Sequence, residues 1–282
     1  MAINLVTKFL PYVDEIFTTE SKKSLLTNND FDWTGAHTVK VHKVNTVSMN
    51  DYKRAGTSGT GVASRYGELG EVGNTIEEFT LRKDRSFTFV IDKLDKDETG
   101  NVLSGATALA RQQREVIIPE IDSYVYGIMA ANAGTKVTTV TLTNDNIYDE
   151  IIKGTEVLDN AEVPEVGRVL TVVPEVYRLM KKNPDINLDC DITAEQRAKG
   201  VIAMVDGMDV IKIPSKRMPS KAGFMIAHPV ATVAPTKLED YKVHQDPPGI
   251  SGELVEGRIC YDAFVLDNKK MAIYYEENKS AT

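Results

Sequence analysis

The 282-residue sequence is short of the residues that build disulfide frameworks and metal sites. It contains two cysteines, Cys190 and Cys260, and neither belongs to a CxxC pair, so we expect two buried or half-buried free thiols. Of its four histidines, only His37 and His42 are close in sequence. Because zinc sites need several Cys or His ligands at short spacings, the sequence predicts no metal centre.

Long apolar runs are also missing. No run of about 18 apolar residues occurs, so no membrane-spanning helix is predicted. The N-terminus lacks the basic residues that open a secretory signal peptide, and Lys8 and Pro11 interrupt its apolar residues. We therefore expect a protein that stays soluble in a reducing, cytosol-like compartment.

The sequence has no excess of positive charge. Its formal net charge is −8 and its pI is near 5.2, whereas a protein that grips nucleic acid over its whole surface is basic. Any contact with nucleic acid must then be local or indirect. With 42% hydrophobic and 26% charged residues, the composition is that of a globular protein and not of a disordered chain.

Several segments match the start of a catalytic or ligand-binding motif, but each lacks a residue that the motif requires. Ser64 stands where a dinucleotide fingerprint needs its third glycine, and Thr60 occupies the second glycine position of a nucleophile elbow around Ser58. An EF-hand-like start at Asp185 has Cys190 in place of the turn glycine. We interpret the acidic residues 92–98 as a helix-capping group. The sequence predicts neither an enzyme nor a cofactor.

The longest regular pattern covers residues 102–132. Apolar or small residues recur there mostly at steps of three, four or seven, which predicts one face of a helix roughly 45 Å long. Residues 97–101, which are acidic and cap-forming, are suited to its start, and Asn132 and Gly134 to its end. Pro119 predicts a kink near residues 115–119. The predicted face consists of Leu103, Ala106, Ala110, Ile117, Ile121, Tyr124, Ile128 and Ala131.

Two alternating segments surround a glycine-rich stretch. Residues 37–47 predict a largely exposed strand, and a second long strand is predicted from Glu77 to Leu94. Residues 48–73 hold six of the chain's 19 glycines, and such a long segment without a core is usually functional or disordered. The pattern predicts an extended hairpin that is too polar to fold alone and lies on another surface.

The rest of the chain alternates between helices and strands, which predicts a compact α/β or α+β domain followed by more strands. A buried strand at residues 168–173 and a tight turn at Asp206-Gly207 are its clearest features. The other expected strands are 135–143, 201–205, 209–213, 223–227, 231–234, 241–244, 254–266 and 271–275, and the expected helices are 145–160, capped by Asn144, and 175–182. Asp267-Asn268 is predicted as a turn, and Pro247-Pro248-Gly249 as the centre of a rigid exposed loop.

The segment at residues 3–17 is weakly amphipathic and leaves two interpretations open. It is either a short helix docked on its own fold or an arm that packs on a neighbouring molecule. Asp14, Glu15 and Glu20 argue against a helix lying on an anionic membrane.

In its order of parts the chain resembles the major capsid proteins of tailed bacteriophages, which have the HK97 fold. The motif REVIIPEIDSY at residues 114–124 resembles the spine-helix signature of one group of these proteins. The motifs DPPGISG at 246–252, EGR at 256–258 and YDAFVLD at 261–267 resemble their peripheral loop and final strands. The resemblance covers nearly the full chain and implies an α+β, HK97-like capsid fold.

The resemblance also implies an arrangement of parts. They are an N-terminal arm at 1–35, an extended hairpin loop with peripheral strands at 36–95, and a peripheral domain with the spine helix at 96–143. An α/β apical domain at 144–230 follows, then peripheral strands and a loop at 231–265, and a C-terminal strand at 266–282 that returns to the apical domain.

The function implied by the resemblance is self-assembly. Copies of the chain would form pentamers and hexamers of an icosahedral or prolate head around double-stranded DNA, without catalysis. The extended loop would contact neighbouring subunits through Lys53, Arg54, Arg65, Glu68 and Glu71, and we hypothesise that its cations pair with acidic groups across capsomers. Pro247, Pro248 and Gly249 would meet their equivalents at three-fold axes. Lys53 is suitably placed for the Lys–Asn crosslink of some relatives, but no catalytic Glu is identified.

Partners and location follow from the same resemblance. A separate scaffolding protein is expected unless a leader has been removed, together with a portal, decoration proteins, and packaged DNA contacted non-specifically; no membrane is involved. Assembly would take place in the host bacterial cytoplasm, and the product would be the virion. The alternatives are an encapsulin-like shell around a cargo protein and a small α/β enzyme or ligand-binding protein.

Overall fold

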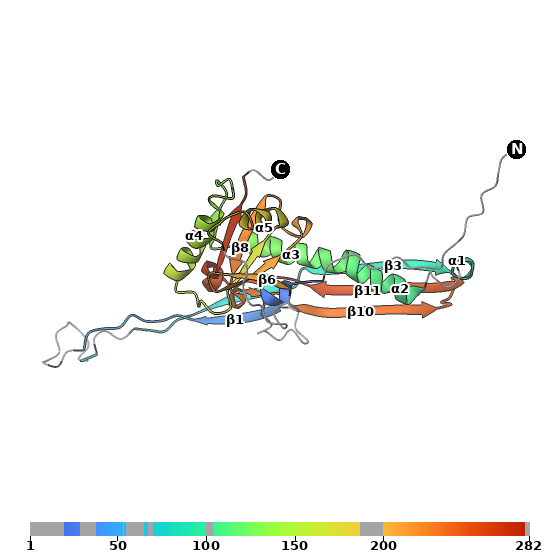
Figure 1. Ribbon diagram of the computed structural model, residues 1–282. Coiled ribbons are helices and arrows are strands. Elements are labelled where there is room, and N and C mark those ends of the chain that lie inside the picture. The colour runs from blue at the N-terminus through green and yellow to red at the C-terminus, as the bar shows by residue number, and fades with distance from the viewer. Residues whose placement is uncertain are drawn as a thin grey trace. The chain divides into compact units, whose positions relative to one another are not determined.

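The computed structural model describes residues 20–28, 38–52, 54, 65–66, 70–99, 104–186 and 200–279 (Figure 1). The chain divides into two compact units. The main unit consists of Met1–Asp32 and Arg82–Thr282, and the hairpin unit consists of Trp33–Leu81. Each unit is described by itself.

A six-stranded mixed sheet forms the core of the main unit, with strand order β4-β13-β8-β5-β7-β6. At its centre, β5 (Val169–Val172) and β8 (Ala222–Ala227) consist entirely of buried residues. Strands covered on both faces are apolar along their whole length, and this explains why residues 168–173 were recognisable as a buried strand. The outer strands are β13 (Ile273–Glu277), β4 (Thr135–Val137), β7 (Met208–Lys212) and β6 (Val201–Val205).

The hairpin of β6 and β7 confirms the turn predicted at Asp206-Gly207. Both turn residues have positive φ, 50° at Asp206 and 72° at Gly207. A two-residue turn of this kind matches the twist of the strands that it joins, and Asp-Gly is among the sequences that tolerate it best. The local sequence alone therefore determined this part of the sheet.

Two helices flank the six-stranded sheet. Helix α4 (Ile147–Asn160) packs on it at Gly154, where an added Cβ would lie 2.8 Å from Ile226 Cδ1. Helix α5 (Pro174–Met180) begins directly after β5, with Pro174 at a favoured first position. The predicted cap Asn144 is wrong, because Asn146 precedes α4 and its side-chain oxygen accepts from the Thr143 N–H at 2.8 Å.

The long helix is present but has three parts. Helix α2 (Gly105–Gln112) is followed by a π-helical segment, Gln113–Ile117, and by α3 (Ile118–Ala131). The π segment lies at the place where Pro119 predicted a disturbance, since proline removes one donor from the ladder. The helix ends at Asn132, as expected, and Asn132 N donates to Ile128 O.

The predicted start and face of this helix need correction. Residues Lys93–Glu98 form a separate helix, α1, capped by Asp92, and the long helix is capped instead by the Ser104 hydroxyl, which accepts from Thr107 N–H. Ala106 and Ala110 are exposed, whereas Val125, Tyr126 and Met129 are fully buried. Helix α3 is more deeply buried than α2. A single apolar face predicted along the whole length does not account for this difference.

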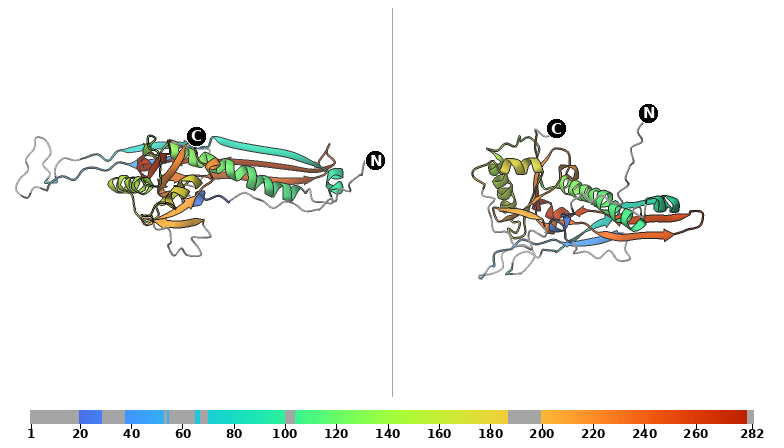
Figure 2. Two further views of the ribbon diagram at one scale, coloured as in Figure 1. Left: turned by 45° about the horizontal axis from the view of Figure 1, so that its top comes forward. Right: turned by 45° about the vertical axis from the view of Figure 1, so that its right-hand side comes forward.

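A three-stranded antiparallel sheet lies along the long helix, with order β10-β11-β3 (Figure 2). Its strands are β3 (Lys83–Asp92), β10 (Thr236–Gln245) and β11 (Gly252–Tyr261). Burial alternates along β11 because the helix covers only one face. Two predicted strands have different bounds in the structure. The strand predicted at 241–244 is longer and covers residues 236–245, and the strand predicted at 254–266 is interrupted at Asp262.

The hairpin unit contains β1 (Thr38–Val44) paired antiparallel with β2 (Asn74–Thr80). Cross-strand ion pairs join Lys40 to Glu78 and Lys43 to Glu77, both at 2.5 Å. The prediction of one long strand from Glu77 to Leu94 is wrong, because β2 and β3 belong to different sheets. Between these two strands, the backbone N–H of Arg82 donates to the side-chain oxygen Oδ2 of Asp262 at 2.8 Å and not to a neighbouring strand.

Short elements complete the described chain. The strand predicted at 135–143 ends at Val137, and a 3₁₀ helix occupies Asp267–Ala272, where a turn was expected. The pair β9 (Thr232–Val233) and β12 (Phe264–Val265) and the 3₁₀ helices Lys23–Leu25, Ser215–Arg217 and Pro229–Ala231 are the remaining elements. Cys260 is a half-buried free thiol, as predicted. The predicted segment 3–17 and Cys190 lie outside the described residues.

Candidate functional site

The hairpin unit carries the charged residues that the sequence singled out. Arg54, Arg65 and Glu71 are exposed, and Lys53 and Glu68 lie outside the described residues. The structure also shows a contact that sequence reasoning missed: the rings of Tyr52 and Tyr66 pack edge to face with centroids 5.1 Å apart. This contact joins the two limbs of the hairpin beside Arg54 and Arg65.

Apolar side chains of the hairpin unit are unusually exposed. Val44 is 72% exposed, Tyr66 76% and Met49 98%. We call the full set the hairpin apolar set: Val44, Val47, Met49, Tyr52, Tyr66, Val72 and Ile76. A signal for it existed in the sequence, where apolar residues fall on both faces of the alternating segment. Contiguous exposed apolar patches are typical of interaction sites, so this set is a candidate for one.

The loop that joins β10 to β11 is rigid and presents its tip to solvent. Pro248 and Gly249 are exposed, and Pro247 is half-buried. Ile250 N–H donates to Pro247 O at 3.1 Å, and Asp246 N–H donates to Gly252 O at 2.8 Å. Gly252 has φ 140°, and an added Cβ would lie 2.2 Å from Ile91 O, so only glycine fits there.

The start of α2 is attached to the same end of the three-stranded sheet. The Glu253 carboxylate accepts from Lys96 Nζ and from the backbone N–H of Gly105, both at 2.5 Å. The Lys96 hydrogen bond, followed by the Gly105 N–H, holds the pKa of Glu253 below its ordinary value. One side chain therefore fixes α1, α2 and β11 relative to one another.

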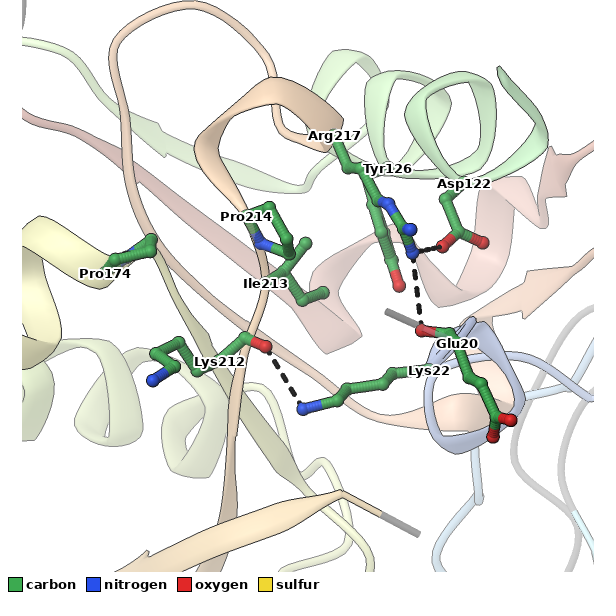
Figure 3. A pocket seen from close by; sticks show the side chains of 9 residues that line it. All are labelled: Glu20, Lys22, Asp122, Tyr126, Pro174, Lys212, Ile213, Pro214 and Arg217. Atoms are coloured by element: carbon green, nitrogen blue, oxygen red, sulfur yellow. Dashed lines mark hydrogen bonds and ion pairs between the residues drawn. The ribbon is translucent and has the colours of Figure 1, made fainter. Parts of the chain in front are cut away.

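A buried ion pair attaches residues 20–28 to the long helix. Arg217 Nη1 lies 2.9 Å from Asp122 Oδ2 and also donates to Glu20 O at 3.3 Å (Figure 3). Ser21 donates to the other Asp122 oxygen at 2.6 Å. Sequence reasoning did not predict this pair, since its partners are 95 positions apart and the motif at 114–124, which contains Asp122, does not indicate Arg217 as its partner.

A second buried acidic group lies between β13 and α4. Glu276 is fully buried and accepts from the Tyr274 hydroxyl at 2.9 Å, while its other oxygen has no hydrogen-bond partner among the described residues. Burial raises the pKa of Glu276 to about 7, with a smaller contribution from Glu150. Glu150, on α4, is paired with Lys153 Nζ at 2.6 Å.

The same residues also bear on two other kinds of site, a metal centre and a membrane-spanning helix. Within the described ranges, no group of three His, Cys, Asp or Glu side chains is arranged to hold a metal ion. No helix in this part of the chain is both long and apolar enough to span a bilayer.

The main unit contains a buried mixed sheet and a long helix along a three-stranded sheet, and the hairpin unit exposes apolar side chains; these elements define an α+β protein. No protein-family model matches the chain, and no curated protein matches it in sequence. Solved structures do match in fold.

The matches extend over almost the entire chain. A chain of Mycobacterium phage Che8 is 18% identical, with TM-score 0.75 over 99% of this chain and 98% of that one. The capsid structure of the cyanophage P-SCSP1u gives 15% identity and TM-score 0.73 over 96% and 92%. The mature capsid of bacteriophage PhiM1 gives 13% identity and TM-score 0.70 over 98% and 92%. The chain therefore has the fold of phage capsid structures, and the expected HK97-like fold class is confirmed.

Proposed function

We propose that this protein is the major capsid protein of a tailed phage, which assembles into pentamers and hexamers of a head enclosing double-stranded DNA. The observation that carries the proposal is the likeness in fold, over nearly the whole chain, to chains of the P-SCSP1u and PhiM1 capsids. The proposal includes no catalytic step and no cofactor. Assembly in the host cytoplasm and location in the virion belong to the same proposal.

The hairpin unit supports this function physically. The hairpin apolar set is exposed to solvent, and apolar surface gains roughly 25 cal/mol for each Å² removed from water. In a shell, the hairpin would lie on a neighbouring copy and bury this set there. If every copy uses the same contact and the contacts close by symmetry, the copies form a closed shell.

The charged residues of the hairpin would set the register of this contact. We propose that Arg54 and Arg65, with Lys53, pair with acidic groups of a neighbouring subunit, and that Glu68 and Glu71 pair with basic ones. Pro247, Pro248 and Gly249 would meet their equivalents at three-fold axes, where a rigid exposed tip suits a repeated contact. Residues 144–230 would cluster with four or five other copies around a capsomer axis.

The remaining partners follow from the same role. We propose a separate scaffolding protein, a portal and decoration proteins as partners during assembly. The net charge of −8 suits a wall that confines packaged DNA without binding it specifically. A few basic groups on the inner face would suffice for that contact.

Size-exclusion chromatography with negative-stain microscopy tests the function. We expect large capsomers or shells, and DNA in particles recovered from an infected host. A monomer or dimer that forms no larger particle under any assembly condition would refute the proposal. Shells that enclose a cargo protein and no DNA would identify an encapsulin-like container instead.

A pair of charge reversals tests the role of the hairpin. The Arg54→Glu, Arg65→Glu double variant should remain folded and fail to close a shell. The matched control is Lys136→Glu, Lys279→Glu, which makes the same change in net charge on exposed residues outside the segments assigned to contacts between copies. Normal particles from the hairpin variant would contradict the assigned contact.

A further inference from the structure

An open-sided pocket of about 160 Å³ lies where residues 20–22 cross the main unit (Figure 3). Its walls come from segments far apart in the sequence: the chain before the first 3₁₀ helix, α3, the end of β7 and the 3₁₀ helix at Ser215–Arg217. Neither the proposed function nor the fold likeness gives this pocket a role.

A buried hydroxyl points into this pocket. Tyr126, on α3, has a fully buried side chain, and its hydroxyl has no hydrogen-bond partner among the described residues. Figure 3 shows the hydroxyl directed past Ile213 into the space beside residues 20–22. A buried hydroxyl without a hydrogen-bond partner is unfavourable, so its presence indicates that a bound group supplies the missing hydrogen bond.

The pocket also carries an excess of positive charge. Lys22 Nζ donates to Gly200 O at 3.1 Å and to Lys212 O at 3.2 Å, both neutral carbonyl groups. Burial lowers the pKa of Lys22, and the charges of Lys212 and Arg217 lower it further. Asp122 neutralises Arg217, but the Glu20 side chain is 78% exposed and pairs with Arg114 instead. An anion in the pocket would relieve this repulsion.

The walls restrict the kind of anion. Pro174, Ile213 and Pro214 supply apolar surface beside the cationic groups. A phosphate would lose hydration against these apolar side chains, which offer its remaining oxygens no hydrogen bonds. A carboxylate with a short carbon chain combines one negative charge with an apolar part, and the volume of about 160 Å³ has room for only a few heavy atoms.

We propose that this pocket binds a carboxylate group. The Tyr126 hydroxyl donates to one carboxylate oxygen, the Lys22 ammonium supplies the counter-charge, and the carbon chain rests against Ile213 and Pro214. The carboxylate belongs either to a free short-chain acid or to an Asp or Glu side chain of a second copy of this chain.

Propionate is the probe for the unassembled full-length chain. Compared with chloride at equal ionic strength, saturating propionate should raise the melting temperature by a few degrees, because it binds only the folded state. It should also slow the acylation of Lys22 severalfold relative to exposed Lys182, as read by mass spectrometry, since a bound anion favours the protonated amine. Inorganic phosphate should do neither.

Two variants separate binding from general stability. Tyr126→Phe removes only the hydroxyl and should abolish both responses to propionate, and Lys22→Met should abolish the thermal response. The matched control is Tyr124→Phe, because the Tyr124 hydroxyl lies on the same helix but donates to Asp262 at 2.7 Å, outside the pocket. That variant should keep both responses.

Assembled particles distinguish the two sources of the carboxylate. If a second copy fills the pocket, propionate should act on the unassembled chain and lose its effect on particles; if a free acid is the ligand, the response persists in both. The proposal is overturned if propionate is no more effective than chloride on the unassembled wild-type chain, or if Tyr126→Phe responds as the wild type does. The readouts on the unassembled chain, which decide the proposal, require no shell, so their failure is independent of the proposed function.

Discussion

The six-stranded sheet and the hairpin unit use similar strand-forming residues in opposite ways. Every residue of β5 and β8 is buried, whereas in β1 and β2 most residues are at least partly exposed and Val44 is 72% exposed. Buried apolar area stabilises the isolated chain; exposed apolar area stabilises only an assembly. On the proposed function, stability and association are encoded in different segments, and single changes should separate them.

The three-stranded sheet is intermediate between these two regions. Along β11, one face is buried beneath the long helix and the other carries exposed charges. On that exposed face, Arg258 pairs with Asp84 at 2.5 Å and His244 with Glu256 at 3.4 Å. Exposed pairs of this kind contribute little to stability, so the covered face holds this sheet in place.

The largest effect is expected in the buried region. Asp122→Ala leaves the Arg217 guanidinium buried without its carboxylate, which should destabilise the unassembled chain by about 3–5 kcal/mol. Urea denaturation of the unassembled chain measures this loss. The double variant Asp122→Leu, Arg217→Met should recover most of it, and a single variant as stable as the wild type would show that the pair is unimportant.

The next effect is a dependence of stability on pH. Because burial raises the pKa of Glu276 to about 7, the group contributes fully below the unfolded value of about 4.5, and this contribution is lost as pH rises through about 7. The loss is on the order of 2 kcal/mol. Glu276→Gln should remove it, and denaturation midpoints of both proteins at pH 5 and pH 8 test this. Equal pH dependence in the two would assign the effect to other groups.

A smaller effect with the opposite pH dependence is expected at the start of α2. The lowered pKa of Glu253 means that its stabilising contribution is present above about pH 4.5 and is lost as pH falls through the folded value. Glu253→Gln should cost about 1 kcal/mol at neutral pH, as loss of a helix cap does. Thermal denaturation at pH 7 and pH 3 should show the two proteins converging at low pH.

The smallest effect on stability, and the one that sharpens the contrast most, is expected in the hairpin unit. Tyr66→Ser should change the free energy of unfolding of the unassembled chain by less than about 0.5 kcal/mol, because its side chain is mostly exposed. The same change should raise the protein concentration needed for assembly, as measured by light scattering. A large loss of stability with unchanged assembly would reverse the roles assigned to the two regions.

The features that could be predicted from the sequence are local. The buried strand β5 and the Asp206-Gly207 turn depend on neighbouring residues, and the fold class followed from the order of parts and four motifs. Features set by distant contacts were missed. The break between β2 and β3 depends on Asp262, which is 180 positions away from Arg82. Tyr126 is buried by segments distant in sequence, which the periodicity of its own helix cannot indicate. For the same reason the charged hairpin residues were named from sequence, whereas the Asp122–Arg217 pair and its pocket were not.

The edge-to-face contact of Tyr52 and Tyr66 has a consequence for the rate and strength of association. It closes a loop between the two limbs of the hairpin, so the chain loses part of its conformational entropy before it meets a neighbour. A pre-organised ribbon gives up less freedom on docking, which tightens binding without adding any contact to the partner. If the hairpin docks as proposed, the aromatic pair acts on the energetics of shell formation even where neither ring touches another subunit.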